Sequence, residues 1–272
     1  MTTHAANMLS PVPLLREKNA VIYGGGGTIG SAVARAFARE GATVFLAGRT
    51  LERVQAVAND ISRQGGTAEA AQVDAGDERA IEKHVGRVAA KARQIDILFD
   101  AVGVEDVQGT PLLEIPLEDF VHPIITAART KFATARAVAR HMVQHGSGVI
   151  MTITGEPTPA TDLGGFMPAC EAVEGIWRTL AFELGPYGVR LIVLRSAGSP
   201  DAPSVQSVVS VHAEKRGISP DEYHTDRGTR TMLRRLPLVA EVANAATLLA
   251  SDRASAMTAM NANVTCGAFF DL

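Results

Sequence analysis

The chain has 272 residues, of which 46% are hydrophobic and 20% are charged, and its net charge is −3. This length and composition predict a single α/β domain, because such folds often exceed the usual domain size without splitting. The mild acidity excludes the basic field that nucleic-acid binding needs. No apolar run reaches the roughly 20 residues of a membrane span.

Residues 1–18 lack the apolar segment of a signal peptide, so we expect an N-terminal arm on a cytoplasmic protein. The two cysteines, Cys170 and Cys266, lie far apart in the sequence and have no metal-ligand spacing. We therefore expect reduced thiols and no metal site.

Short apolar runs alternate along the chain with longer segments of helical period. Several of the runs are apolar on both faces, which is typical of parallel strands covered by helices. The predicted strands are Ala20–Tyr23, Thr43–Ala47, Ala68–Val73, Ile95–Ala101, Gly148–Ile153, Arg190–Leu194 and Ala262–Thr265. The predicted helices are Ile29–Glu40, Leu51–Gln64, Asp77–Arg93, Leu117–His145, Gly165–Gly185 and Val239–Ser251. This alternation predicts a doubly wound parallel sheet of the Rossmann type over residues 19–272.

The first predicted strand runs into Tyr23-Gly-Gly-Gly-Gly-Thr28-Ile29-Gly30, after which a helix begins. Glycines at such a junction let backbone N–H groups approach a pyrophosphate at the helix N-terminus. The alternative is a glycine turn that only packs the helix onto the sheet. Arg49 follows the second strand, where a site for NAD places a carboxylate, and an arginine there suits a 2′-phosphate. Unless Arg49 is a plain surface residue, the sequence predicts NADP(H) rather than NAD(H).

The segment from Ser199 to Arg235 shows no clear period. It is polar, holds three prolines and is longer than ordinary connections, so we interpret residues 199–235 as a substrate lid. His212, Tyr223 and His224 lie within it. A histidine there either closes over a substrate or is an ordinary surface residue.

These motifs resemble those of the short-chain dehydrogenase/reductase family. The glycine turn resembles the family's Thr-Gly-x-x-x-Gly-x-Gly: Gly24 and Gly30 match, Thr28 replaces the middle glycine and Tyr23 replaces the threonine. Matching segments continue at 184–190 and 263–267. The resemblance implies that the turn binds the cofactor through Gly24, Gly27, Thr28, Ile29 and Gly30.

The resemblance also extends to the ends of the third and fourth strands. Asp74 and Ala75 match the place where the family holds the adenine, although Asp74 is equally suited to capping the next helix. Ala101 and Gly103 fall within the family's Asn-Asn-Ala-Gly, where Asp100 and Ala101 replace the two asparagines. A buried Asp100 is either paired with a backbone N–H or has a raised pKa.

The family's four catalytic positions are all altered. Its asparagine falls at Ala127, its serine at Thr154 or Gly155, its tyrosine at Phe166 and its lysine at Cys170. In the family the tyrosine hydroxyl is the acid/base, and the lysine lowers its pKa and holds the ribose. Phenylalanine has no exchangeable proton, and cysteine supplies no fixed ammonium.

Several groups are candidates to replace the missing acid. The nearby carboxyl groups are Asp100, Glu156, Asp162 and Glu171, of which Glu156 directly follows the fifth strand. We take Thr154 and Glu156 as the candidate catalytic residues. Cys170 is either a thiol acid or a small buried residue. Lys131, one turn beyond Ala127, is expected to face a subunit seam.

Two functions remain open, and the lid argues against a third, a purely structural role as an oligomer. The first is an NADP(H)-dependent oxidoreductase with atypical acid/base chemistry, reducing a conjugated C=C or C=N bond of a small molecule. The second is a non-redox scaffold: a cofactor-binding pseudoenzyme, a cyclase or an isomerase. The resemblance implies a homotetramer, the usual assembly of the family. Its subunit seam is predicted along Leu117–His145 and Gly165–Gly185, because small residues suit close helix contact: the alanines at 127, 128, 133, 135, 137 and 139.

Overall fold

The computed structural model describes residues 12–156 and 161–269, so residues 1–11 of the expected N-terminal arm lie outside that part. One sheet of seven parallel strands has the order β3-β2-β1-β4-β5-β6-β7. The strands are β1 (Asn19–Tyr23), β2 (Thr43–Gly48), β3 (Thr67–Gln72), β4 (Ile97–Asp100), β5 (Gly148–Gly155), β6 (Val189–Ser196) and β7 (Met260–Val264). The direction in which the sheet grows reverses between β1 and β4. Ligands of such sheets bind at the carboxyl ends of the strands beside this switch point.

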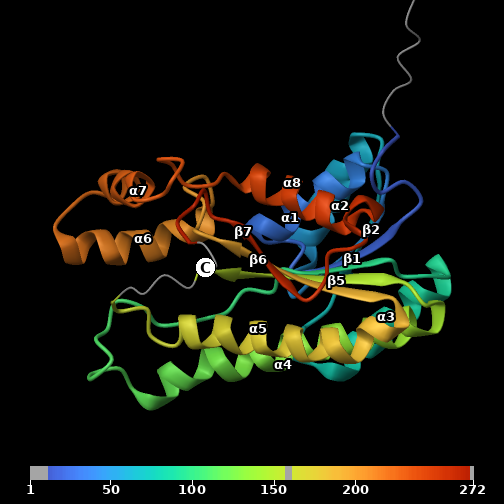
Figure 1. Ribbon diagram of the computed structural model, residues 1–272, viewed down its shortest axis with the longest axis horizontal. Coiled ribbons are helices and arrows are strands. Elements are labelled where there is room, and N and C mark those ends of the chain that lie inside the picture. The colour runs from blue at the N-terminus through green and yellow to red at the C-terminus, as the bar shows by residue number, and fades with distance from the viewer. Residues whose placement is uncertain (1–11, 157–160, 270–272) are drawn as a thin grey trace, which may run out of the picture.

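Helices cover both faces of the sheet (Figure 1). One face carries α1 (Thr28–Arg39), α2 (Leu51–Arg63) and α8 (Val239–Ala250), whose apolar side chains share one core cluster. The other face carries α3 (Glu78–Ala92), α4 (Leu117–His145) and α5 (Phe166–Leu184), which share the second cluster. The predicted doubly wound sheet is confirmed, and the predicted ends of its elements differ by at most two residues.

The segment interpreted as a lid is helical, although its sequence shows no period. It forms α6 (Pro203–Arg216) and α7 (Pro220–Thr229), which project past the carboxyl ends of the strands (Figure 1). Pro203 and Pro220 occupy the first turns of these helices, where proline needs no N–H partner, and a capping box of Ser219 and Glu222 begins α7. The period is absent because these helices bury little more than a small cluster of their own, around Val209, Ala213 and Tyr223.

A buried ion pair joins the sheet to α4 beneath the switch point. Lys131 Nζ lies 2.8 Å from Asp100 Oδ1, and both side chains are almost fully buried. Thr134 donates a hydrogen bond to Asp100 Oδ2 at 2.5 Å, and the Val102 N–H donates to Oδ1 at 2.9 Å. The sequence leaves open whether Asp100 pairs with a backbone N–H or has a raised pKa. The structure shows the backbone pairing, with the Val102 N–H.

The expectation that Lys131 faces a subunit seam is wrong. Lys131 lies four residues after Ala127, so both side chains point from the same inner face of α4. Four of the six alanines expected at the seam, at 127, 135, 137 and 139, are also buried in the core. Alanine on this helix therefore allows close packing within the subunit.

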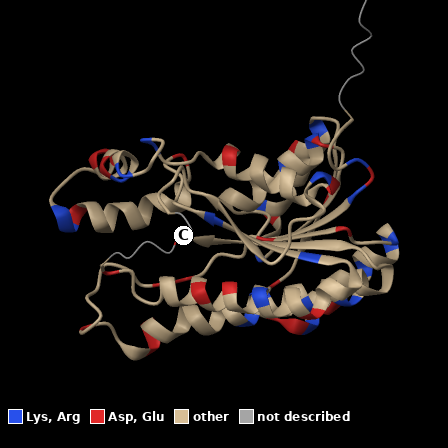
Figure 2. Cartoon of the chain, viewed as in Figure 1, with Lys and Arg blue, Asp and Glu red and all other residues tan. Residues whose placement is uncertain are grey.

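Charges of both signs are interspersed over the outer helices, as Figure 2 shows for α3 and α4. Within the described residues, no helix is both long and apolar enough to cross a bilayer.

We predict that Lys131→Met lowers the free energy of unfolding by about 3–5 kcal/mol, because it leaves the buried Asp100 carboxylate without its cation. Guanidinium unfolding measures the loss. The control is Lys91→Met, which breaks the exposed pair with Glu69 and is expected to cost about 1 kcal/mol or less. Equal effects of the two variants would contradict the importance of the buried pair.

Candidate functional site

The glycine turn packs too closely against its neighbours for side chains at two positions. Gly24 has a φ of 71°, and a Cβ there would lie 2.4 Å from the Ala101 carbonyl oxygen. A Cβ on Gly30 would lie 2.3 Å from the Gly24 carbonyl oxygen. The first contact holds the turn between β1 and α1 against the residue after β4, and the second packs the start of α1 onto the turn itself. Gly103, further along that end, is exposed and has open space around it.

The N-terminus of α1 is open for an anion. Its N-cap is Gly27, no side chain caps the first N–H groups, and the first turn holds no acidic residue. Helix N-termini with free N–H groups carry a partial positive charge and bind phosphates. Thr28 is the first helical residue, and its Oγ1 accepts a hydrogen bond from Ser204 of α6 at 3.4 Å. Ile29 packs against the core, so the turn touches both the sheet and the lid.

Arg49 lies at the end of β2 and is paired with an acid. Its Nη2 lies 2.9 Å from Glu105 Oε1, and about 70% of each side chain is exposed. The hydrogen bond and charge of Glu105 raise the pKa of Arg49. A 2′-phosphate at Arg49 has to compete with this carboxylate. Glu105 escaped notice in the sequence, although two acids in a row, Glu105 and Asp106, follow β4 at the ligand-binding edge.

Asp74 and Ala75 follow β3 beside Arg49. Asp74 Oδ1 accepts a hydrogen bond from the Gly76 N–H at 2.8 Å. Asp77, and not Asp74, caps α3 by accepting from the N–H groups of Arg79 and Ala80. Ala75 is buried. Asp74 therefore shapes the turn at the edge where an adenine would lie.

The catalytic end brings Gly155, Phe166 and Cys170 together. The Gly155 N–H donates to Cys170 Sγ at 3.4 Å, and a Cβ on Gly155 would lie 2.6 Å from Phe166 Cε1. Gly155, the last residue of β5, is therefore the residue of the pair Thr154 and Gly155 that faces Phe166. Burial raises the pKa of the Cys170 thiol to about 11, which keeps the sulfur protonated at neutral pH.

Thr154 belongs to a hydrogen-bond network around Glu174, on the face of the sheet that α5 covers. Its hydroxyl donates to Glu174 Oε1 at 3.1 Å, and Glu174 pairs with Arg195 at 2.6 Å and accepts from Asn261. Ala127 on α4 is buried in the core of this layer. The Thr154 hydroxyl is thus engaged by Glu174 in this network.

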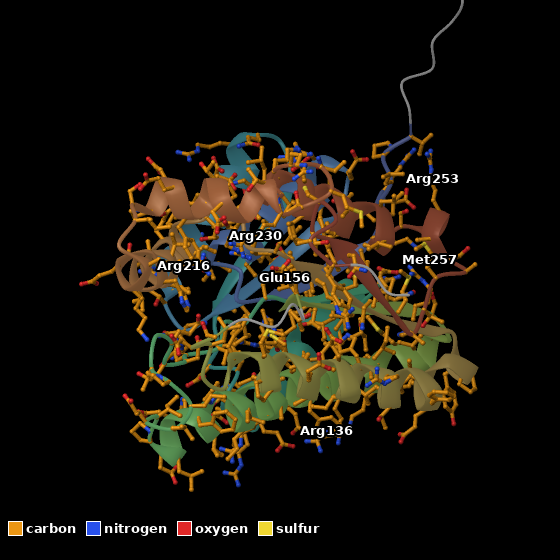
Figure 3. The ribbon with its side chains drawn as sticks, turned by 60° about the vertical axis from the view of Figure 1, so that its left-hand side comes forward. Arg136, Glu156, Arg216, Arg230, Arg253 and Met257 are labelled. Carbon is orange, nitrogen blue, oxygen red and sulfur yellow. The ribbon has the colours of Figure 1, made fainter. Side chains whose placement is uncertain are left out.

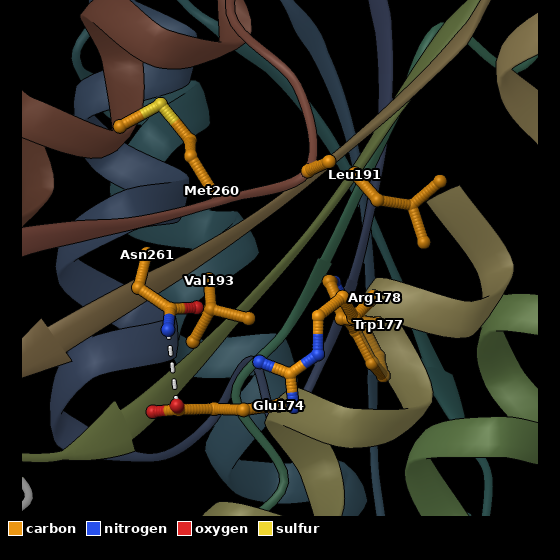
Figure 4. A pocket seen from close by; sticks show the side chains of 8 residues that line it. Glu174, Trp177, Arg178, Leu191, Val193, Met260 and Asn261 are labelled. Atoms are coloured by element: carbon orange, nitrogen blue, oxygen red, sulfur yellow. Dashed lines mark hydrogen bonds between the residues drawn. The ribbon is translucent and has the colours of Figure 1, made fainter. Parts of the chain in front are cut away.

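Figure 4 shows Glu174 and Asn261 beside a small cavity near the sheet edge. The cavity has a volume of about 30 Å³, and Trp177 lines it. The Trp177 Nε1 atom is buried and has no hydrogen-bond partner within the described part of the chain. The volume suits a water molecule and is far below the roughly 300 Å³ of ligand pockets.

Glu156 directly follows β5 and is bound by the lid. Its Oε1 lies 3.0 Å from Arg227 Nη2, and the same nitrogen donates to the Ala197 carbonyl oxygen at 2.6 Å. Glu156 Oε2 is buried and has no partner among residues 12–156 and 161–269. Figure 3 shows Glu156 between the layer that holds the lid arginines and the layer of α4. The sequence alone did not single out Arg227, since 71 residues separate it from Glu156.

The lid residues expected near a substrate lie in two places. His212 of α6 is buried, donates from Nε2 to Gln108 Oε1 at 2.9 Å, and stacks on Tyr223 with ring centroids 6.1 Å apart. Both ring nitrogens of His224 on α7 are buried without a partner in the described structure. Burial is the main cause that lowers the pKa of both histidines, so each favours the neutral form.

A nicotinamide dinucleotide fits one half of this site. The open N-terminus of α1 fits a pyrophosphate, and Arg49 and Asp74 would border the adenosine end of the cofactor. At the other end, Phe166 and Cys170 offer neither the hydroxyl nor the ammonium that the family resemblance implies. When bound, the cofactor would supply a hydride.

Comparisons with known proteins agree with this architecture. A family model described as Enoyl-(Acyl carrier protein) reductase matches residues 26–268. (+)-cis,trans-Nepetalactol synthase NEPS1 of Nepeta racemosa is 29% identical over 282 residues, covering 97% of this chain and 98% of that protein. Sorbitol-6-phosphate 2-dehydrogenase SrlD from Erwinia amylovora has a TM-score of 0.86 at 26% identity, covering 93% of this chain and 100% of that one.

A 7α-hydroxysteroid dehydrogenase complexed with NADH and 7-oxo glycochenodeoxycholic acid has a TM-score of 0.83 at 27% identity, covering 96% of this chain and 98% of that one.

Proposed function

The chain belongs to the short-chain dehydrogenase/reductase family, and we propose that it is an NADP(H)-dependent oxidoreductase that works without the family's tyrosine–lysine pair. One observation carries the proposal. The cofactor end keeps its open helix N-terminus and glycine turn, while the catalytic end holds Phe166 and Cys170. The site thus retains the parts needed to bind a hydride donor and lacks the usual proton donor.

The missing phenol determines which acceptors suit the site. A positioned general acid contributes typically 10²–10⁴-fold to a rate, so its loss should slow the reduction of an ordinary ketone by a similar factor. A conjugated C=C bond can take its proton from another acid or from water, and an iminium needs no proton during hydride delivery. We therefore propose a small molecule with a conjugated C=C or a C=N bond as the substrate.

Glu156 supports the C=N alternative. Its Oε1 is neutralised by Arg227, whereas Oε2 is buried without a partner in the described structure. A buried carboxylate oxygen is costly unless a donor or a positive charge reaches it. A protonated imine nitrogen would supply both.

A non-redox scaffold is the second candidate. It is favoured by the similarity to NEPS1, which is named a synthase although other relatives of this chain are named dehydrogenases. A cyclase, an isomerase or a cofactor-binding pseudoenzyme would use the pocket alone. Tight NADPH binding without turnover of any carbonyl, enone or imine would favour this second function.

We further propose a cytoplasmic homotetramer that binds neither nucleic acid nor membrane. The seam along α4 and α5 is supported by exposed apolar side chains: Ile125 is 50% exposed, Phe132 39% and Phe182 82%. Such side chains are normal singly, but several on two packed helices favour an interface.

The acceptor preference is tested with NADPH and three probes: cyclohexanone, 2-cyclohexen-1-one and 2-methyl-1-pyrroline. We expect the enone or the imine to be reduced about 10²-fold faster than the ketone, measured as loss of NADPH absorbance. The double variant Phe166→Tyr, Cys170→Lys is expected to gain ketone reduction. Wild-type enzyme that reduces cyclohexanone as fast as the other probes would refute the proposal. A double variant that binds NADPH and gains nothing would mean that the acceptor pocket itself has changed.

Cofactor preference is tested at Arg49. We expect Arg49→Ala to weaken NADPH binding by roughly 1.5–3 kcal/mol and to leave NADH binding unchanged, as calorimetry would measure. The matched variant Glu105→Gln removes the competing carboxylate and is expected to tighten NADPH binding. Equal losses for both cofactors in Arg49→Ala would show that Arg49 does not contact the 2′-phosphate.

The subunit seam is tested by light scattering at micromolar concentration. We expect a tetramer for the wild type and a smaller assembly for Phe182→Glu, which places a charge on the proposed seam. Leu113→Glu, at a fully exposed side chain on the loop before α4, is the control and is expected to remain a tetramer. A monomeric wild type would exclude the seam.

A further inference from the structure

Most carboxyl groups around Phe166 are already neutralised by a cation. Each of these carboxyl groups is engaged in a charge-assisted hydrogen bond to a lysine or an arginine. The pairs are Asp100 with Lys131, Glu156 with Arg227, Asp162 with Lys215 and Glu174 with Arg195. Glu171 is exposed to solvent on α5.

Asp106 is a further carboxyl group at this edge. It lies on the loop after β4, and two backbone contacts hold that loop against the turn that leads into Phe166. The Gly109 N–H donates to the Asp162 carbonyl oxygen at 2.7 Å, and a Cβ on Gly164 would lie 2.2 Å from the Val107 carbonyl oxygen. The loop therefore brings Asp106 to the side of the Phe166–Cys170 pair.

The hydrogen-bond partner of Asp106 is neutral. Gln108 donates from Nε2 to Asp106 Oδ2 at 2.6 Å, and Gln108 Oε1 accepts from His212 of the lid. No lysine or arginine is paired with Asp106 in the part of the chain that the structure describes. Burial raises the pKa of Asp106, which is half-buried, and so favours a carboxyl group that holds its proton.

The groups that face Asp106 leave this carboxyl group without a fixed cation. His212 on α6 favours its neutral form, and Cys170 on α5 keeps its proton. Lys215, also on α6, lies 2.9 Å from Asp162 and is occupied by it.

We propose that Asp106 is the proton donor of the site in place of the missing phenol, with Gln108 and His212 as residues that position it when the lid lies over the strand ends. This inference rests on the proposed oxidoreductase function. It also gives the lid a chemical role, since α6 fixes the acid through His212.

The step balances for a conjugated C=C bond. The hydride adds to the β-carbon, the electron pair of the double bond moves to the α-carbon and the carbonyl, and the α-carbon takes the proton of the Asp106 carboxyl group. The carboxylate that remains is protonated again from solvent. Two electrons and one proton enter as hydride, one proton enters from Asp106, and the product is the saturated ketone.

The first experiment measures the protonation of Asp106 directly. Side-chain carboxyl shifts of protein labelled with ¹³C-aspartate are followed by NMR during a pH titration. We expect one carboxyl group that titrates above the usual aspartate range and disappears in Asp106→Asn. Titration of Asp106 in the ordinary range would overturn the proposal whether or not the enzyme turns over.

The second experiment uses 2-cyclohexen-1-one as the probe. We expect Asp106→Asn to lower kcat about 10²-fold with NADPH affinity unchanged, and to abolish a fall in kcat as pH rises through the pKa of Asp106. Glu114→Gln, an exposed carboxyl on the same connection, is the control and is expected to match the wild type. Asp106→Asn that turns over like the wild type would overturn the acid role and leave the proposed function standing. A wild type that never oxidises NADPH with this probe would refute the role of Asp106 and the C=C branch of the proposed function.

Gln108→Leu tests the positioning role. Gln108 stabilises the ionised form of Asp106 by its hydrogen bond, so its loss should raise the pKa and move the fall in kcat to higher pH. A purely structural glutamine would change the rate at every pH without moving the profile, and that result would overturn its assignment.

Discussion

The buried Asp100 carboxylate is the constraint on which the rest of the site depends. It lies at the end of β4, beside the switch point of the sheet, with no exposed surface. Lys131 and Thr134 attach it to α4, and Thr152 of β5 donates to its carbonyl oxygen. A buried charge is tolerated only when its partners are fixed. The loop that leaves β4 therefore starts from one defined position. This start determines where the loop places Glu105, which pairs with Arg49, and Asp106, which lies on the stretch held against the turn before Phe166.

The sequence predicts the sheet well because strand and helix periods are local. Glycines at the first junction and an arginine after the second strand are local signals too, and they fall at one edge of the sheet as expected. The errors concern side chains whose partners are distant in sequence. Lys131 is predicted to face a subunit seam, whereas its actual partner, the buried Asp100, lies 31 residues away in the sequence. The contacts of Arg227 and Asp106 join the lid to the strand ends and to the loop after β4, so these contacts exist only in the folded chain and leave no local signal in the sequence.

The lid illustrates a different limit of the sequence. The prolines and the missing period predict a long connection over residues 199–235, yet Pro203 and Pro220 each lie in the first turn of a helix. Proline in the helix interior would break it, but at the start its fixed φ and missing N–H cost nothing. With so few apolar residues buried by α6 and α7, no period marks them as helical. Hydrogen bonds and stacking, such as those of His212 with Gln108 and Tyr223, fix their position instead.

The changes at the catalytic end depend on one another physically. The Phe166 ring lies where a side chain on Gly155 would have to be, since a Cβ there would approach the ring to 2.6 Å. A serine at position 155 is therefore incompatible with the present position of the ring. Cys170 accepts the Gly155 N–H, which a lysine could not do because its ammonium is only a donor. An ammonium at position 170 would also be buried, where a charge is costly unless it is paired. Once the ring and the sulfur fill this space, a proton for the product has to arrive from outside it, along the loop after β4 or from the lid.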